Sequence, residues 1–279
     1  MKDREYATPF TMLHAASLLS HRSRLDKFKQ AIQQVVKEGD YVVDIGTGSG
    51  VLAIFAAKAG ARSVSAIDIN PESLSYAKKA AQMNSVGEVI EFIEGSYSEF
   101  KPKERADVVI CEMLSSMMLV EQQIPASIHA LENILKPGGV ILPCEITVYT
   151  VPVECSIIWD RFQYENLQFP RVVQSITPEA TRDLADLNIL VNFHIMKLHR
   201  ESKVDRTLHF TILESGTIHG LVGVFESKLH GNIYLKMEDG WKQLFLPLNQ
   251  PIEVKAGDMF STRIFYRPGE FDSLSIKVL

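Results

Sequence analysis

Hydrophobic and polar positions follow two different rhythms along the chain, and the rhythm changes near residues 151 and 152. Before this point, short apolar runs alternate with stretches of helical periodicity, a pattern typical of a parallel α/β sheet. The strands predicted there are Tyr41 to Ile45, Ser63 to Ile67, Val89 to Ile93, Asp107 to Cys111 and Val140 to Leu142. After this point the period falls to two, which predicts antiparallel strands in a barrel-like or sandwich β-domain. These strands are Thr147 to Val153, Ile189 to Leu198, Thr207 to Leu213, Asn232 to Glu238 and Ser261 to Tyr266.

Local signals place the helices between these strands. A long amphipathic helical stretch is predicted from Met12 to Lys37, in one piece or two. Asn70-Pro71-Glu72 predicts a helix start, because asparagine caps helices and proline suits the first helical position. Lys136-Pro137-Gly138-Gly139 predicts a helix stop before the fifth strand. The chain is therefore divided into a helical cover (1–38), an α/β domain (39–151) and a β-rich domain (152–279).

Composition limits the classes of protein to which the chain can belong. Its 279 residues, 46% of them hydrophobic, are enough for two compact domains with separate cores. The charged start, Met1 to Glu5, leads into no apolar segment, and no apolar run approaches the length of a membrane span, so we expect a cytoplasmic protein without membrane contact. A net charge of −5 disfavours a bulk electrostatic grip on nucleic acid. The spacing of the three cysteines and the scattered histidines predicts no metal site and no disulfide framework.

A glycine-rich turn follows the first predicted strand, in the run Asp44-Ile45-Gly46-Thr47-Gly48-Ser49-Gly50. Glycines at alternate positions let backbone N–H groups approach a ligand closely, and the next helix adds its positive end to the same place. A dinucleotide fold requires a third glycine where this chain has Val51. Asp68, at the end of the second strand, is placed to accept both hydroxyls of a ribose. The turn therefore predicts a cofactor that contains a nucleoside.

Three segments resemble known families. Gly-x-Gly-x-Gly after an aspartate resembles the first motif of the class I S-adenosylmethionine (SAM) methyltransferases. The run from Ile110 to Glu121, with glutamates at 112 and 121, resembles the double-glutamate loop of the protein arginine methyltransferases. Gly240-Trp241-Lys242-Gln243 is similar to that family's Thr-His-Trp-Lys-Gln loop. The resemblance covers nearly the whole chain, most densely from Val42 to Val153, and implies a Rossmann-like SAM-binding domain followed by a β-barrel-like domain.

The resemblance also implies roles for individual residues. Glu112 and Glu121 would hold the planar guanidinium of an arginine and stabilise the charge that arrives with the methyl group. Trp241 would lie on the substrate side. Asp44 would orient the methionine end of SAM and Arg24 would bind its carboxylate, while Ser98, with Glu99 beside it, stands at the adenine position. The cofactor contacts implied in this way are Arg24, Asp44, Gly46, Gly48, Gly50, Asp68 and Ser98.

The chain departs from the family around the acceptor. The loop histidine is replaced by Gly240, Ser115-Ser116 stand where Gly-Tyr is common, and Tyr6 to Phe10 lacks the Tyr-Phe-x-x-Tyr order. We therefore expect methylation of arginine in a protein or peptide, with two alternatives left open. One is N-methylation of a small molecule or RNA, and the other is a SAM-binding sensor or scaffold without efficient transfer.

The segment from Val153 to Ile189 is short for the long arm through which family members dimerise. A homodimer, if formed, is therefore predicted to use another surface. The apolar residues Leu18, Leu25 and Phe28 of the N-terminal helical stretch are the candidates for that surface.

Overall fold

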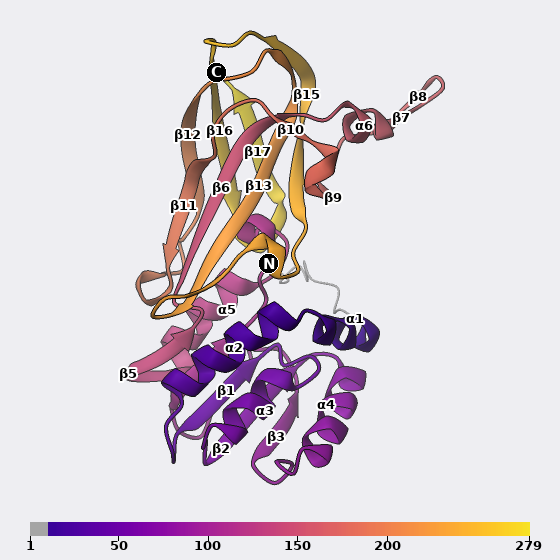
Figure 1. Cartoon of the computed structure of the whole chain (residues 1–279). Coiled ribbons are helices and arrows are strands. Elements are labelled where there is room, and N and C mark those ends of the chain that lie inside the picture. Colours follow the sequence, from indigo (N-terminus) through magenta and orange to yellow (C-terminus); the bar gives the residue numbers. More distant parts are fainter. Residues whose placement is uncertain (1–10) are drawn as a thin grey trace.

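A parallel sheet lies at one end of the molecule and a curled antiparallel domain at the other in the computed structural model, which describes residues 11–279 (Figure 1). The parallel sheet has the strand order β3-β2-β1-β4-β5. Its strands are β1 (Tyr41–Ile45), β2 (Ser63–Asp68), β3 (Ile90–Glu94), β4 (Ala106–Cys111) and β5 (Leu135–Leu142). The predicted architecture, a Rossmann-like core followed by an antiparallel barrel-like domain, is confirmed.

Helices cover both faces of this sheet, and in Figure 1 α2, α3 and α4 lie in front of the strands. Asn70 caps α4 as predicted, since its side chain accepts hydrogen bonds from the backbone N–H groups of Glu72 and Ser73. The predicted N-terminal helical stretch breaks at Leu18 into separate pieces. The α-helices are α1 (Met12–Ser17), α2 (Arg22–Val35), α3 (Val51–Lys58), α4 (Pro71–Met83), α5 (Gln123–His129) and α6 (Ser156–Trp159). The shorter helical turns are η1 (Leu18–Ser20), η2 (Ser116–Met118), η3 (Ala130–Ile134), η4 (Asp160–Phe162), η5 (Pro178–Ala180), η6 (Ile195–Lys197) and η7 (Met237–Asp239).

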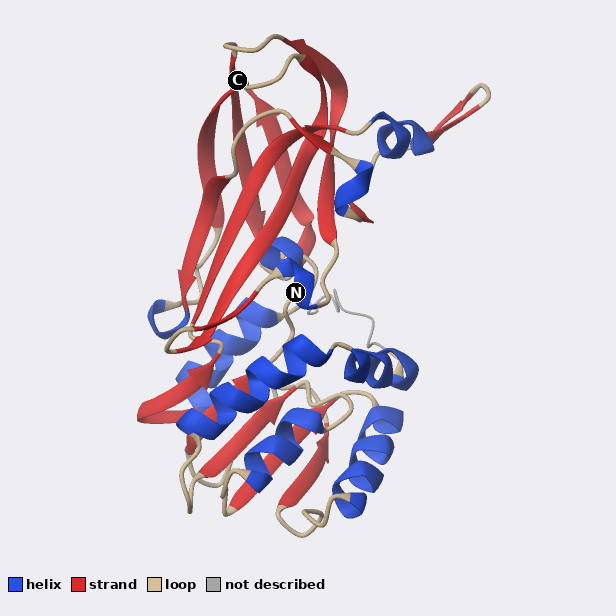
Figure 2. Ribbon diagram, in the orientation of Figure 1, coloured by secondary structure: helices blue, strands red, loops and turns tan. Residues whose placement is uncertain are grey.

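The antiparallel domain consists mainly of two sheets (Figure 2). The larger has the order β10-β6-β13-β15-β9, with β11 paired to β6 and β14 paired to β13, and the smaller has the order β12-β16-β17. Strands β7 and β8 form a separate hairpin that projects from the body of the molecule (Figure 1). The strands are β6 (Glu145–Glu154), β7 (Gln163–Tyr164), β8 (Leu167–Gln168), β9 (Gln174–Ile176), β10 (Arg182–Asp183), β11 (Asn188–His194), β12 (Val204–Thr211), β13 (Gly216–His230), β14 (Ile233–Leu235), β15 (Gln243–Val254), β16 (Met259–Arg267) and β17 (Glu270–Val278).

Several predicted elements need correction. The longest strand, β13, was not predicted, because Gly220 and Gly223 interrupt its apolar pattern. These glycines mark close packing and not a turn: a Cβ at Gly220 would lie 2.4 Å from the backbone oxygen of Leu246. The strand predicted from Ile189 to Leu198 ends at His194, where the chain turns into η6. The run Lys136-Pro137-Gly138-Gly139 lies inside β5, because that strand already pairs with β4 at Leu135 and bulges before the pairing resumes at Val140.

The predicted division of the chain after residue 151 falls inside β6. This strand pairs with β11 from Glu145 to Thr150 and with β13 from Glu145 to Val153, so its whole length is joined to the antiparallel domain. We propose that the β-domain begins at residue 145.

The apolar surface predicted for a dimer is smaller than expected. Phe28 is fully buried in the core, and Leu18 and Leu25 are half-buried. Large exposed apolar side chains occur instead in the segment 157–172, at Ile157, Tyr164, Leu167, Phe169 and Val172. No helix in the described part of the chain is long and apolar enough to cross a membrane.

Candidate active site

The candidate site lies at the carboxyl ends of β1, β2 and β4. The strand order changes direction between β1 and β4, and ligands of open α/β sheets bind outside the carboxyl ends of the strands at such a point. The glycine-rich turn follows β1, Asp68 ends β2, and Glu112 follows β4 directly. Three of the predicted site segments are therefore brought to one edge of the sheet.

The three glycines of the turn adopt left-handed backbone conformations, with φ values of +73° at Gly46, +52° at Gly48 and +78° at Gly50. Two of them also lack space for a side chain. A Cβ at Gly50 would lie 2.7 Å from the Cβ of Ala77 in α4, and a Cβ at Gly46 would lie 3.1 Å from Cγ of Met113. The turn is thus held close to both α4 and the segment after β4.

Asp44 lies buried at the start of this turn. Its Oδ2 accepts a hydrogen bond of 2.6 Å from the hydroxyl of Thr47, whereas its Oδ1 has no hydrogen-bond partner among residues 11–279. Burial raises the pKa of the Asp44 carboxyl to about 7, and the nearby Asp68 and Glu112 carboxylates add to the rise. A cation that reached Oδ1 would remove this unfavourable arrangement.

Asp68 braces the turn from the neighbouring strand. Its two oxygens accept hydrogen bonds from the backbone N–H groups of Gly48, at 2.8 Å, and Asn70, at 2.9 Å. Ser98, by contrast, is exposed in the turn after β3, where its hydroxyl lies 2.8 Å from that of Ser96. The structure therefore places Asp68 against the glycine-rich turn and shows no contact between Ser98 and that turn.

On the acceptor side, Glu112 forms an ion pair with Arg24 from α2, and both side chains are largely buried. The Arg24 guanidinium also lies over the indole of Trp241, with Cζ 4.6 Å from the ring centroid. Trp241 is held in turn by a hydrogen bond of 2.8 Å from its Nε1 to the backbone oxygen of Leu114. Three predicted site residues from distant parts of the chain are thus brought into one cluster.

Glu121 interacts electrostatically with this cluster. Burial raises the pKa of its carboxyl to about 8, the Glu112 carboxylate raises it further, and Arg24 opposes the rise. Its backbone N–H donates to the hydroxyl of Ser115 at 3.1 Å. The two predicted glutamates therefore lie within each other's field, as a shared cation site requires.

The loop between the glutamates is supported by the β-domain. Met117 and Met118 are fully buried with φ values of +63° and +54°, conformations that non-glycine residues rarely adopt. The hydroxyl of Tyr266 donates to the backbone oxygen of Met117 at 2.7 Å. A Cβ at Gly223 would lie 2.2 Å from the Met117 side chain. From the sequence, Tyr266 was predicted only as the end of a strand and Gly223 was not singled out, because neither has a local signal that relates it to the loop.

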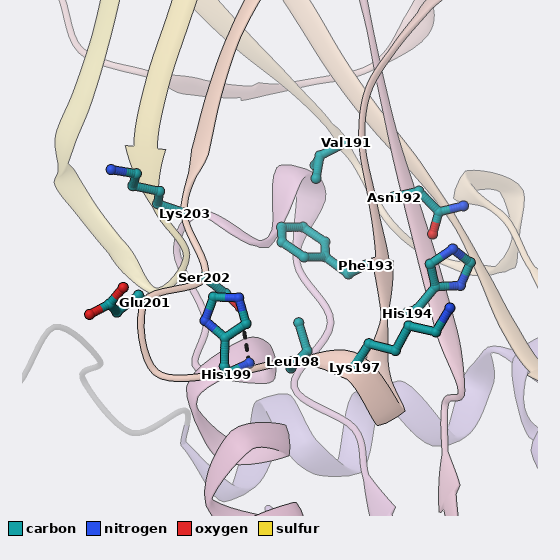
Figure 3. Close-up of a pocket in the computed structure, with 10 residues that line it drawn as sticks. All are labelled: Val191, Asn192, Phe193, His194, Lys197, Leu198, His199, Glu201, Ser202 and Lys203. Carbon is teal, nitrogen blue, oxygen red and sulfur yellow. Dashed lines mark hydrogen bonds between the residues drawn. The ribbon is translucent and has the colours of Figure 1, made fainter.

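Two cavities lie elsewhere. The one in Figure 3, of about 290 Å³, is where β11 passes through η6 into β12, and it is lined by residues 191–194, 197–199 and 201–203. None of these is a predicted site residue, so we do not assign the chemistry to it. A groove of about 580 Å³ lies between α2 and β14. It is closer to the site in the fold, since α2 also contains Arg24 and β14 leads through η7 to Trp241.

Known proteins resemble this chain over most of its length. The model of the ribosomal protein L11 methyltransferase (PrmA) family matches residues 29–145, and that of the PRMT5 oligomerisation domain matches residues 145–268. An uncharacterized protein of Methanocaldococcus jannaschii is 31% identical over 255 residues, which cover 89% of this chain and 94% of the relative. A probable protein arginine N-methyltransferase 6 of Arabidopsis thaliana is 34% identical over 170 residues, which cover 60% of this chain. The chain belongs to the class I methyltransferases that resemble the protein arginine methyltransferases.

Solved structures show the same fold as this chain. A PRMT1 enzyme–prozyme complex of Trypanosoma brucei has a TM-score of 0.80 at 20% identity, over 94% of this chain and 91% of that one. Protein arginine methyltransferase 10 of Arabidopsis thaliana has a TM-score of 0.78 at 21% identity, over 96% of both chains. The chain nevertheless spans only 38% and 42% of the length of two Arabidopsis arginine methyltransferases that it matches in sequence.

The cofactor of this class is SAM, and the residues at the carboxyl ends of β1 and β2 fit it. The unpartnered Oδ1 of Asp44 is a buried acceptor, which suits the ammonium group of the methionine end. The glycines leave room for the backbone to approach a ligand. Tyr6 to Phe10, which sequence analysis compared with the family's N-terminal motif, lie outside the described residues.

Proposed function

We propose that this methyltransferase transfers a methyl group from SAM to the guanidinium of an arginine in a protein or peptide. The observation that supports this most strongly is the cluster of Arg24, Glu112 and Trp241. Glu112 and the Trp241 ring hold one guanidinium in the acceptor side of the site, and the charge of the same guanidinium acts on Glu121. Groups that hold one guanidinium have the charge and the flat shape to hold another.

On the cofactor side, we assign Asp44 to the ammonium group of SAM, Asp68 to the ribose and Arg24 to the carboxylate. When bound, SAM supplies an electrophilic methyl group on a positively charged sulfur. Arg24 would therefore serve both sides of the site, since it is assigned to the SAM carboxylate and also pairs with Glu112 on the acceptor side. A carboxylate near Arg24 would share the guanidinium with Glu112 and so leave that glutamate more available to an acceptor. Ser98 is retained as the residue proposed for the adenine side.

On the acceptor side, we assign Glu112 and Glu121 to the guanidinium of the substrate. The transfer forms a carbon–nitrogen bond, breaks the carbon–sulfur bond of the methyl donor and releases one proton from the methylated nitrogen. Glu121, with a pKa of about 8, is suited to accept that proton near neutral pH once the cation has made the carboxylate form available. The two carboxylates also stabilise the positive charge that arrives with the methyl group.

The groove beside the site supports a polypeptide acceptor. Its α2 wall is built from Lys27, Gln30 and Gln34, which lie on one helix face, and its other wall is built from β14 and the residues that flank it, including Asn232, Tyr234 and Lys236. At about 580 Å³, it has room for more than one side chain. The amide side chains of such walls can both donate hydrogen bonds to a peptide backbone and accept them from it.

The test is to incubate the purified protein with SAM labelled in its methyl group and a cell lysate, and then to hydrolyse the products. We expect label in protein-bound methylarginine. The matched control is the double variant Glu112→Gln/Glu121→Gln, which keeps the shape of both side chains and should transfer almost no label. Label in RNA or in a small molecule would support the alternative acceptor classes, and no transfer with intact SAM binding would indicate a sensor or scaffold.

For partners, we propose that any homodimer does not use a long arm in the region 153–189. The exposed apolar side chains of the β7–β8 hairpin and its neighbours make this segment the one to examine. Light scattering across a concentration series, followed by cross-linking, examines it directly. A stable dimer whose cross-links centre on residues 155–185 would contradict the proposal.

A further inference from the structure

Gly240, at the position where the resemblance places a histidine, has its side-chain space filled by another histidine. A Cβ at Gly240 would lie 2.3 Å from Nδ1 of His21 and 2.8 Å from its Cε1. The backbone of Gly240 also has a φ of +128°, which L-residues rarely adopt. The imidazole of His21, which comes from the start of α2, therefore lies where only a glycine leaves room for it.

The position of this imidazole is fixed from both sides. Asp239 accepts hydrogen bonds from the Ser23 hydroxyl and, at 2.6 Å, from Nζ of Lys27, so η7 is tied to the first turns of α2. In the α2 segment, His21 is three residues before Arg24. In the segment after η7, Gly240 directly precedes Trp241. Arg24 and Trp241 are in contact in the acceptor cluster. His21 is thus close in sequence to Arg24, and it packs against the residue that precedes Trp241.

One nitrogen of the His21 imidazole lacks a hydrogen bond. Nδ1 of His21 is buried and has no hydrogen-bond partner in the described part of the chain. Leaving a buried polar atom unpaired costs about 1–3 kcal/mol, and native structures rarely contain such atoms without a reason. Residues 11–279 supply no partner for Nδ1, and a group of a bound molecule can fill that role.

We infer that His21 is a contact for the methyl acceptor, with Nδ1 accepting a hydrogen bond from an N–H group of the substrate. The partner chemistry is an N–H donor of a polypeptide, either of the arginine guanidinium or of the backbone beside it. This inference rests on the proposed function, because it places an arginine-containing polypeptide in the same site. It also explains Gly240, since any side chain there would displace the imidazole.

The inference is tested with three substitutions at one position. Asparagine places an amide oxygen near the position of Nδ1, glutamine places its amide nearer to that of Nε2, and alanine removes both. With total lysate protein as the acceptor, His21→Ala and His21→Gln should raise the half-saturating acceptor concentration about tenfold, the effect of one lost hydrogen bond. His21→Asn should restore it to within about threefold of the parent. The dissociation constant for SAM should stay within about twofold of the parent in all three.

A second variant checks the geometry independently. Gly240→Ala should displace the imidazole and raise the half-saturating acceptor concentration about as much as His21→Ala, and the double variant should be no worse than either, because both changes remove one contact. An unchanged acceptor concentration in His21→Ala would overturn the inference. Equal losses in all three His21 variants, together with weaker SAM binding, would also overturn it by showing a purely structural role. If the parent protein labels no polypeptide at all, the proposed function fails instead.

Discussion

The cofactor half and the acceptor half of the proposed site are built in different ways. The cofactor half comes from one continuous stretch, in which β1, the glycine-rich turn and β2 supply Asp44, the three glycines and Asp68 within 25 residues of sequence. The acceptor half is assembled from α2, the loop after β4 and the segment after η7. Gly223 of β13 packs against Met117 in that loop. The cofactor half depends on local backbone geometry, whereas the acceptor half depends on how the two domains pack.

This difference accounts for where the chain departs from its relatives. All members of the class use the same nucleoside-containing cofactor, so few sequences are acceptable in the turn proposed to bind it. In the acceptor half, one segment can fill space that a side chain of another segment leaves empty, as the His21 imidazole does beside Gly240. Arg24 belongs to both halves, since it pairs with Glu112 and is the residue proposed for the SAM carboxylate.

The largest expected effect is a loss of turnover without a loss of SAM affinity. Glu121→Gln should lower turnover about 100-fold or more, because it removes charge where a cation must be stabilised, while the dissociation constant for SAM stays within about twofold of the parent. Glu112→Gln should lower turnover similarly but tighten SAM binding a few-fold, since Arg24 is released from its ion pair. Steady-state kinetics and calorimetry measure both quantities. Parent-like turnover in both variants would refute the guanidinium site.

The complementary change is made on the cofactor side. Asp68→Ala should weaken SAM binding about 10- to 100-fold, equivalent to about 1–3 kcal/mol for buried hydrogen bonds to the ribose. Turnover at saturating SAM should change little. Glu72→Ala is a matched control, because Glu72 is an exposed carboxylate in the first turn of α4 and should have no effect on SAM affinity. Unchanged affinity in a folded Asp68→Ala variant, measured by calorimetry, would exclude the ribose role.

A third change tests the support of the acceptor half from the β-domain. Gly223→Ala places a methyl group 2.2 Å from the Met117 side chain, which must then move together with the loop between the glutamates. We expect about 1–3 kcal/mol of destabilisation in denaturant unfolding and about a tenfold loss of turnover, with SAM affinity preserved. Met117→Ala in the same protein should restore part of the lost turnover by making room. A variant that loses SAM affinity and turnover equally would indicate that the two halves are not separate.

The smallest expected effect is on pH dependence. The folded pKa of Glu121, about 8, lies above the ordinary value of 4.5, so the folded protein holds this proton more tightly than the unfolded chain does. The resulting stability is fully present below about pH 4.5 and is lost as the pH rises through 8. For this one group, the free energy of unfolding falls by at most about 1.4 kcal/mol per pH unit.

Glu121→Gln should remove that part of the slope, and the difference between the two proteins isolates it from the titration of Asp44. Because a cationic acceptor binds the deprotonated carboxylate better, kcat/KM for the acceptor should rise with pH up to about 8. Chemical denaturation and kinetics between pH 5 and pH 9 measure these trends. A parent protein with the same pH slope as Glu121→Gln would contradict the assignment.

The sequence predicts the cofactor half better than the acceptor half for a physical reason. The turn from Asp44 to Gly50 has a local signature, and the structure brings Asp68 against it by pairing β1 with β2. The contact of Arg24 with Trp241 joins residues more than 200 positions apart, and only a resemblance could suggest that both face one site. The supporting roles of Gly223, Tyr266 and His21 were not predicted, because each follows from packing between domains and not from any local pattern. The strand β13 was missed for the same reason, since Gly220 makes room for the Leu246 backbone and Gly223 for the Met117 side chain.

A comparison of four proteins tests the separation of the two halves most directly: the parent, Asp68→Ala, Glu121→Gln and the double variant, each measured for SAM affinity and for turnover at saturating SAM. The account predicts that the double variant has the SAM affinity of Asp68→Ala and the turnover of Glu121→Gln, within about twofold. A double variant whose SAM affinity differs from that of Asp68→Ala by tenfold or more would show that the halves act as one unit, and would contradict the account.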